Sequence, residues 1–87
     1  MHRDVGQTAV VVEDDPIQRE LLASVLEEFE FSVIQCESAE TALLEIEACQ
    51  LSFLVTDVNL AGDMDGVELA HRVRAHDPDV RIVVVSG

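Results

Sequence analysis

The chain has 87 residues, of which 48% are apolar and 26% are charged. A chain of this length forms one domain, because its core is too small to be divided in two. The balance of apolar and charged residues is that of a globular protein. Five basic and eighteen acidic side chains give a net charge of −13, which the phosphates of a nucleic acid repel. We therefore expect a globular domain that does not bind nucleic acid directly.

The sequence shows no apolar run that approaches the length needed to span a bilayer, and residues 1–8 are polar, unlike a signal peptide. Cys36 and Cys49 lack the close spacing of a redox or zinc motif, and cytosolic thiols stay reduced. We expect a cytoplasmic protein that makes no contact with a membrane and whose two thiols are buried and inert.

Apolar runs and helical stripes alternate along the chain. The first run, at residues 9–12, is β-branched and lacks polar alternation, which predicts a central strand buried on both faces. Asp15 and Pro16 then form an N-cap and first-turn pair, and the apolar residues that follow recur at helical spacing. The predicted strands cover residues 9–12, 31–36, 51–56 and 82–85. The predicted helices cover residues 16–29, 39–48 and 67–76.

Strands that alternate with helices in this way predict an α/β fold with a parallel sheet covered on both faces. In such sheets the ligand site lies beyond the carboxyl ends of the strands, where the strand order reverses. Polar residues stand at these ends. We expect the following residues to converge: Glu13, Asp14 and Asp15 after the first strand, Asp57 after the third, and Ser86 after the fourth.

Carboxylates held this close raise one another's pKa unless a cation lies between them. Mg²⁺ suits such a site, because it takes one or two carboxylates and leaves positions for phosphate oxygens. Asp14 and Asp57 are the candidate direct ligands. Asp57 stands alone at the end of a buried strand and is therefore the candidate nucleophile, while Ser86 can donate a hydrogen bond to a transferred phosphoryl group.

Three motifs carry a family resemblance. In order and spacing, VVVEDDPIQRELL, LVTDVNLAGDMDGVELAHRVR and RIVVVSG resemble the receiver domain of bacterial response regulators, in two-component signalling. The resemblance implies a flavodoxin-like doubly wound sheet, here with about four strands and three helices. It also implies a phosphorelay switch rather than an enzyme.

The resemblance further assigns roles to the polar residues. It implies that Asp57 accepts a phosphoryl group from a histidine kinase or a histidine phosphotransfer protein, with Mg²⁺ as cofactor. Asp14 and the backbone carbonyl of Asn59 would bind the metal beside Asp57, Glu13 would hold it through water, and Ser86 would be the switch hydroxyl. The kinase would dock at the active-site end of the first helix, around residues 17–21.

The sequence departs from the family pattern in three ways. The loop after Asp57 has Ala61 where proline is usual, and it is one residue longer than is common. The chain also stops at Gly87, where the family continues through a helix, a fifth strand that carries a lysine, and a last helix. We therefore expect residues 1–87 to be the N-terminal portion of a receiver domain. We also expect this portion to self-associate through its exposed fourth strand.

Two alternatives stay open. Residues 57–68 place Asp57, Asn59, Gly62 and Glu68 at positions one, three, six and twelve of an EF-hand calcium loop, although Ala61 stands where a fifth-position oxygen is expected. The other alternative is a receiver-like interaction module that is not phosphorylated, because the family's lysine is absent. Phosphorylation of Asp57 discriminates against the module, and a calcium affinity far above the magnesium affinity favours the EF-hand.

Overall fold

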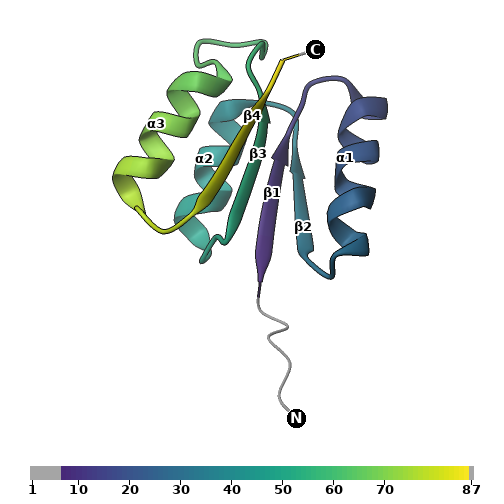
Figure 1. The fold of residues 1–87 in the computed structure, drawn as a ribbon. Helices are drawn as coiled ribbons and strands as arrows, with labels where there is room; N and C mark the ends of the chain where they lie inside the picture. The colour runs from purple at the N-terminus through teal and green to yellow at the C-terminus, as the bar shows by residue number, and fades with distance from the viewer. Residues whose placement is uncertain (1–6, 87) are drawn as a thin grey trace.

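The computed structural model describes residues 7–86, and its strands form one parallel sheet (Figure 1). The four strands lie in the order β2-β1-β3-β4. The strands are β1 (Thr8–Val12), β2 (Ser32–Cys36), β3 (Phe53–Asp57) and β4 (Arg81–Val85). The helices are α1 (Pro16–Glu28), α2 (Ala39–Ala48) and α3 (Gly66–His76). The predicted alternation of strands and helices is confirmed, with boundaries that differ by a residue or two.

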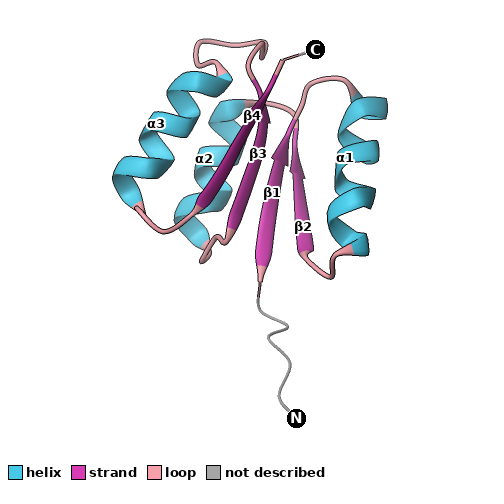
Figure 2. Cartoon of the chain, viewed as in Figure 1, coloured by secondary structure: helices cyan, strands magenta, loops and turns pink. Residues whose placement is uncertain are grey.

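The helices form layers on both faces of the sheet (Figure 2). On one face, α1 packs Leu26 against Ala9, Val11 and Val55. On the other face, α2 and α3 cover a larger core that includes the following buried residues: Val10, Val12, Ala42, Ile46, Leu54, Leu69 and Val73. Alternate residues of β1 therefore serve the two cores, which confirms the doubly wound arrangement.

The strand β1 lies inside the sheet, and every side chain of its apolar run is covered. Residues 9–12 are all 0% exposed, and β1 pairs in parallel with β2 on one side and with β3 on the other. A strand buried on both faces has no polar face, which explains the unbroken β-branched run.

The helices begin where side chains satisfy their first backbone N–H groups. Asp15 Oδ1 accepts a hydrogen bond from the N–H of Ile17 at 2.9 Å. The caps of α2 and α3 act in the same way, through Ser38 Oγ (3.1 Å) and Asp65 Oδ1 (2.8 Å). These caps fix the point at which each loop from the sheet enters its helix.

The outer strand β4 pairs only with β3 and leaves its other side unpaired within the described residues. Val83 and Val84 are 43% and 39% exposed. Apolar side chains are also exposed on α1 and at its end, among them Ile17 and, at the C-cap, Phe29. The expected exposure of the fourth strand is therefore confirmed.

The cysteines differ from one another, and the expectation that both are buried was wrong for one of them. Cys36 is 2% exposed at the end of β2, and burial raises the pKa of its thiol to about 11. Cys49 is exposed and free, because it follows the last turn of α2, where the chain turns back at the surface. In the described part of the chain, no helix is both long and apolar enough to cross a membrane.

Candidate functional site

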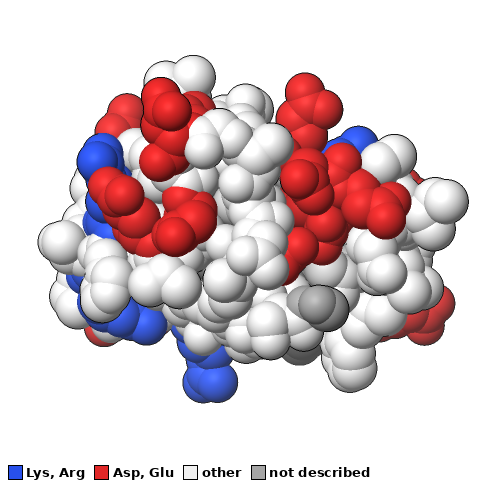
Figure 3. Space-filling view, turned by 90° about the horizontal axis from the view of Figure 1, so that it is seen from above, with Lys and Arg blue, Asp and Glu red and all other residues white. Residues whose placement is uncertain are grey.

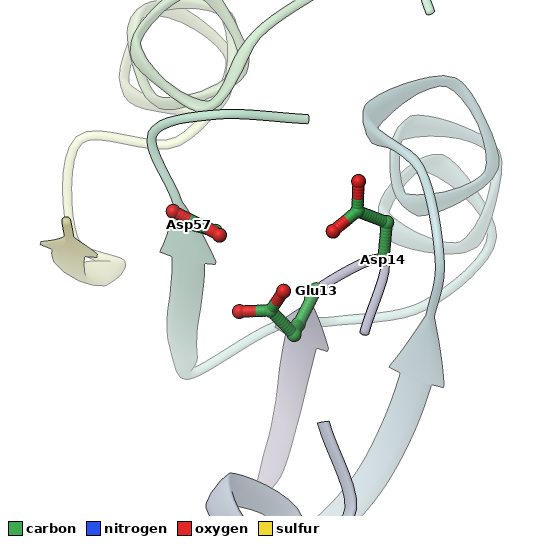
Figure 4. A group of neighbouring side chains, drawn as sticks. All are labelled: Glu13, Asp14 and Asp57. Carbon is green, nitrogen blue, oxygen red and sulfur yellow. The ribbon is translucent and has the colours of Figure 1, made fainter. Parts of the chain in front are cut away.

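The strand order reverses between β1 and β3, and three carboxylates meet there. Glu13 and Asp14 follow β1, and Asp57 is the last residue of β3. One carboxylate oxygen from each of these residues lies within 4.8 Å of the other two, and the side chains face a common space (Figure 4). The predicted convergence is confirmed for these three residues. It follows from parallel strands ending at the same edge of the sheet.

Asp15 was expected both to cap the first helix and to join the converging acids. It caps α1 and lines a cavity with Glu13 and Asp57, but it is not one of the three carboxylates that lie within 4.8 Å of one another. Its carboxylate accepts the N–H of Ile17 as the N-cap of α1. The third acid of the run thus belongs to the helix terminus. The acidic pair of this site is therefore Glu13 and Asp14.

Glu13 is the buried member of the cluster, with 7% of its surface exposed. Its Oε2 accepts the N–H of Asp15 at 3.1 Å, and its backbone carbonyl accepts Arg19 Nη1 at 2.9 Å. Arg19 lies one turn into α1, so it holds the backbone of the acidic pair against the helix. The guanidinium of Arg19 thus fixes the position of the Glu13 backbone and does not neutralise a carboxylate of the cluster.

The environment of Glu13 favours its protonated form. Burial raises the pKa of the Glu13 carboxyl above its ordinary value, the negative charge of Asp57 acts in the same direction, and the N–H of Asp15 opposes both. A cation among the three carboxylates would reverse this balance, because it stabilises the ionised forms.

Asp57 is half-buried, and the backbone around it is closely packed. Asp57 Oδ1 accepts the N–H of Asn59 at 3.2 Å, and its carbonyl accepts the hydroxyl of Thr56 at 3.0 Å. The N–H of Gly66 donates to the carbonyl of Val58 at 3.0 Å. A Cβ at Gly66 would collide with the carbonyl of Asp57, so glycine is required where α3 begins.

Ser86 and Asp57 line the same cavity, of about 460 Å³, between α1 and the ends of β3 and β4. Asn59, Glu13 and Leu22 also line it. The N–H of Val58 donates to the carbonyl of Val85 at 2.8 Å, which ties the residue after Asp57 to the residue before Ser86. The cavity gives a group attached to Asp57 room to approach the Ser86 hydroxyl.

The segment 57–68 does not have the architecture of an EF-hand. Asp57 ends a β-strand rather than a helix, and Glu68 forms an ion pair with Arg72 at 2.8 Å on α3. The capping of α3 by Asp65 places Glu68 in the first helical turn, apart from the carboxylates that converge at Asp57.

The surface around the site is strongly acidic. Figure 3 shows the molecule from above, where acidic side chains gather and basic ones lie mostly toward the rim. This concentration of negative charge attracts divalent cations and raises their local concentration.

The fold and the site define a doubly wound α/β protein with an acidic site at its switch point, and comparison with known proteins gives its family. The model of the response regulator receiver domain matches residues 9–87. The chain belongs to this family, the receiver domains of two-component response regulators. The response regulator receiver protein CpdR of Brucella abortus (strain 2308) is 32% identical over 78 residues, covering 90% of this chain and 64% of CpdR.

Solved structures agree with this assignment. The response regulator TrrA from Thermotoga maritima, in complex with Mg(2+)-BeF, matches with a TM-score of 0.84 and 28% identity over 92% of this chain and 69% of its own. A response regulator from Burkholderia pseudomallei, with a phosphorylated aspartic acid, a calcium ion and citrate, matches with a TM-score of 0.83 and 28% identity, over 93% of this chain and 47% of its own. The chain thus spans less than two thirds of CpdR and a little more than two thirds of TrrA.

Two residues near the site were not predicted from the sequence. The close approach of Gly66 to the backbone of Asp57 depends on how α3 meets β3. Glu40, on α2, contacts the loop after β3 across 24 residues of sequence. No local motif signals such a contact, so only the folded chain could reveal it.

Proposed function

We propose that this chain accepts a phosphoryl group on Asp57, from a histidine kinase or a histidine phosphotransfer protein, in a reaction that depends on Mg²⁺. The observation that carries the proposal is the convergence of three carboxylates within 4.8 Å at the switch point of the sheet. Solved relatives with Mg(2+)-BeF and with a phosphorylated aspartic acid support it.

In the proposed reaction, a carboxylate oxygen of Asp57 attacks the phosphorus of the donor. A P–O bond forms as the P–N bond of a phosphohistidine breaks, and the departing imidazole nitrogen takes up a proton from solvent. The position of Asp57 at the end of β3, opening on a cavity, leaves one side of its carboxylate accessible to a donor. The product is an aspartyl phosphate.

The donor set fits Mg²⁺, which prefers hard oxygen ligands. Asp14, Asp57 and the backbone carbonyl of Asn59 would bind the ion, and Glu13 would hold it through water. The bound ion would offset the charge that develops on the transferred group. The raised pKa of the Glu13 carboxyl in the metal-free site supports the need for a cation there.

The consequence of phosphorylation is a switch in conformation rather than turnover of a substrate. Ser86 shares the cavity of Asp57, so its hydroxyl can turn toward the phosphoryl group and donate a hydrogen bond. The bond between Val58 and Val85 couples the two strand ends. We propose that this rearrangement carries the signal, so the chain is a cytoplasmic signalling switch and not an enzyme in its own right.

The partner would dock on the active-site end of α1. Ile17 and Leu21 are 80% and 61% exposed, and they lie one turn apart close to the acidic pair. Exposed apolar side chains beside a reactive carboxylate suit a surface that receives a helical phosphodonor. In this proposal, residues 1–87 form the N-terminal portion of the receiver domain and make no contact with nucleic acid or membrane.

Intact mass after incubation with Mg²⁺ and a small acyl phosphate tests the proposal. We expect wild type to gain the mass of one phosphoryl group, and we expect Asp57→Asn to gain none. Asp63→Asn, at an exposed position in the loop that follows Asp57, removes the same charge; it is the control and should label like wild type. Removal of Mg²⁺ by a chelator should abolish labelling.

The opposite results would be equally informative. Labelling that survives Asp57→Asn would move the acceptor to another residue. A wild type that takes up no phosphoryl group with any donor would favour the interaction module that binds partners without phosphorylation.

A further inference from the structure

The loop between β3 and α3, residues 58–65, carries Asn59, and a residue from another element holds the second half of this loop. Glu40 lies in the first turn of α2. Its Oε2 accepts the N–H of Met64 at 3.0 Å. This is the only hydrogen bond that an α2 side chain makes to the loop among the described residues, and it crosses from one crossover connection of the sheet to the next.

A second contact fits the same carboxylate to the loop. Gly62 has a φ of 108°, in the left-handed region that favours glycine. Glu40 Oε1 lies 3.1 Å from the position that a Cβ at Gly62 would occupy. The two oxygens of Glu40 therefore lie against two points of the loop, two residues apart.

The side chain of Met64 makes the loop part of the core beneath the site. Met64 is 8% exposed and belongs to the cluster that includes Ala39 and Ala42 of α2. Two contacts therefore hold Met64 in place. Glu40 binds its backbone N–H, and its side chain is buried against α2. The residues between Asp57 and Met64 must then span a fixed distance, which limits the positions open to Asn59.

We propose that Glu40 is a positioning residue for the metal site: its carboxylate holds the loop so that the carbonyl of Asn59 is presented beside Asp14 and Asp57. This inference rests on the proposed function. Glu40 is not itself a ligand, because the carboxylates within 4.8 Å of one another are Glu13, Asp14 and Asp57. Glu40 orders the loop before the ion binds, so the loop loses less conformational entropy on binding.

Two simpler roles for Glu40 make different predictions. An acid in the first turn of a helix stabilises it through the helix dipole, which would change the stability of the fold but not the affinity for metal. An acid near the site could also attract Mg²⁺ through its charge alone. Glu37 separates this second role from positioning, because it lines the same cavity as Asp14 and Glu40. Within residues 7–86, no hydrogen bond joins Glu37 to the loop.

The test compares three variants of the purified chain by titration calorimetry with Mg²⁺. Glu40→Ala removes both charge and acceptor, Glu40→Gln keeps an acceptor oxygen without charge, and Glu37→Ala removes an equivalent charge. We expect Glu40→Ala to weaken Mg²⁺ binding about three- to tenfold. Glu40→Gln and Glu37→Ala should both stay within about twofold of wild type.

A second readout follows the loop directly. In NMR spectra, the amide signal of Met64 and the carbonyl signal of Asn59 should shift or broaden in Glu40→Ala and should return to wild-type positions in Glu40→Gln. A merely structural role in α2 would leave both signals unchanged.

Three results would overturn the inference. Wild-type Mg²⁺ affinity in Glu40→Ala would show that the loop needs no anchor. Equal weakening by Glu40→Ala and Glu37→Ala would assign the effect to charge, and equal weakening by Glu40→Ala and Glu40→Gln would show that the acceptor oxygen is not what matters. A wild type that neither binds Mg²⁺ nor labels on Asp57 would overturn the proposed function as well, which separates the two failures.

Discussion

At the scale of single residues, the site depends on groups that never touch a ligand. Gly66 lies so close to the carbonyl of Asp57 that no side chain fits between them. Arg19 holds the carbonyl of Glu13. Both contacts fix backbone positions, so the reactive carboxylates are placed by the chain around them rather than by their own hydrogen bonds alone.

The first prediction concerns Gly66. Gly66→Ala forces the start of α3 away from β3, and we expect a loss of about 2 kcal/mol in the free energy of unfolding. Urea unfolding followed by circular dichroism measures this loss, since the chain has neither Trp nor Tyr. Ser24→Ala, at an exposed position of α1, is the control and should leave the stability nearly unchanged. Unfolding of Gly66→Ala at the wild-type midpoint would refute the close approach.

The second prediction concerns the pH dependence of the metal-free chain. The pKa of Glu13 is raised by burial above its ordinary value of 4.5. The folded state therefore holds this proton more tightly than the unfolded state. The resulting stability is complete below pH 4.5 and is lost as the pH rises through the raised value. Glu13→Gln should thus be more stable than wild type at pH 7 without metal, and the difference should shrink toward pH 4.5.

Unfolding curves between these pH values, with a chelator present, check the sign. Glu47→Gln, at an exposed position near the end of α2, removes the same charge and should show a smaller pH-dependent gain. Added Mg²⁺ should reverse the order of Glu13→Gln and wild type, because the ion stabilises the ionised carboxylate. A constant difference across the pH range would contradict the assignment to Glu13.

At the scale of elements, the end of α1 shows a local conflict between sequence and conformation. The N–H of Phe31 donates to the carbonyl of Leu26 at 3.2 Å, and the N–H of Glu30 donates to the carbonyl of Glu27 at 2.9 Å. This is the hydrogen-bond pattern of a Schellman motif. Its left-handed position is Glu30, with a φ of 71°, where glycine is favoured.

The third prediction follows from this motif. Glu30→Gly should raise the free energy of unfolding by about 1 kcal/mol, because glycine adopts the left-handed conformation without strain. Glu28→Gly, two residues earlier in the last turn of α1, should instead lower it by a similar amount. Thermal unfolding by circular dichroism compares the two variants. A destabilised Glu30→Gly would mean that contacts of the Glu30 side chain outweigh the backbone strain.

The elements were the part of the fold most open to prediction from sequence. The unbroken apolar run of β1 and the capping pair Asp15–Pro16 are local signals, and both led to the correct element. The acids at the ends of β1 and β3 were placed together by topology alone. The exposure of Cys49 was missed, since it depends on the direction in which the chain leaves α2. The anchor at Glu40 was missed because it joins distant segments.

At the scale of the whole molecule, two surface properties oppose each other. The unpaired side of β4 offers backbone N–H and C=O groups to another strand, and its exposed valines add apolar area. The net charge of −13 drives copies of the chain apart. Self-association through β4 should therefore be weak in low salt and stronger in high salt, which screens the repulsion.

The fourth prediction tests this balance by sedimentation velocity. Wild type should shift toward a dimer as salt increases, and Val83→Lys should stay monomeric because it places a charge in the edge strand. Val67→Lys is the matched control, because it adds the same charge on α3. Val67 and Val83 are equally exposed, at 43%. A dimer that persists in Val83→Lys, or that is lost equally in Val67→Lys, would place the contact outside β4.

The position of β1, with a paired strand on each side, also affects how easily the strands that carry the site open. One part of the site follows β1, and the other follows β4. Amide hydrogens of β1 should exchange with solvent most slowly, because they are fully buried and lie within a continuous ladder. Amides of β4, paired on one side only, should exchange much sooner by local opening. The acidic pair thus follows an inner strand, and Ser86 follows an edge strand, which we expect to open more easily. The part of the site that binds the ion is therefore rigid, and the part that carries Ser86 can move. Phosphorylation of Asp57 can then change the conformation of the surface beside β4.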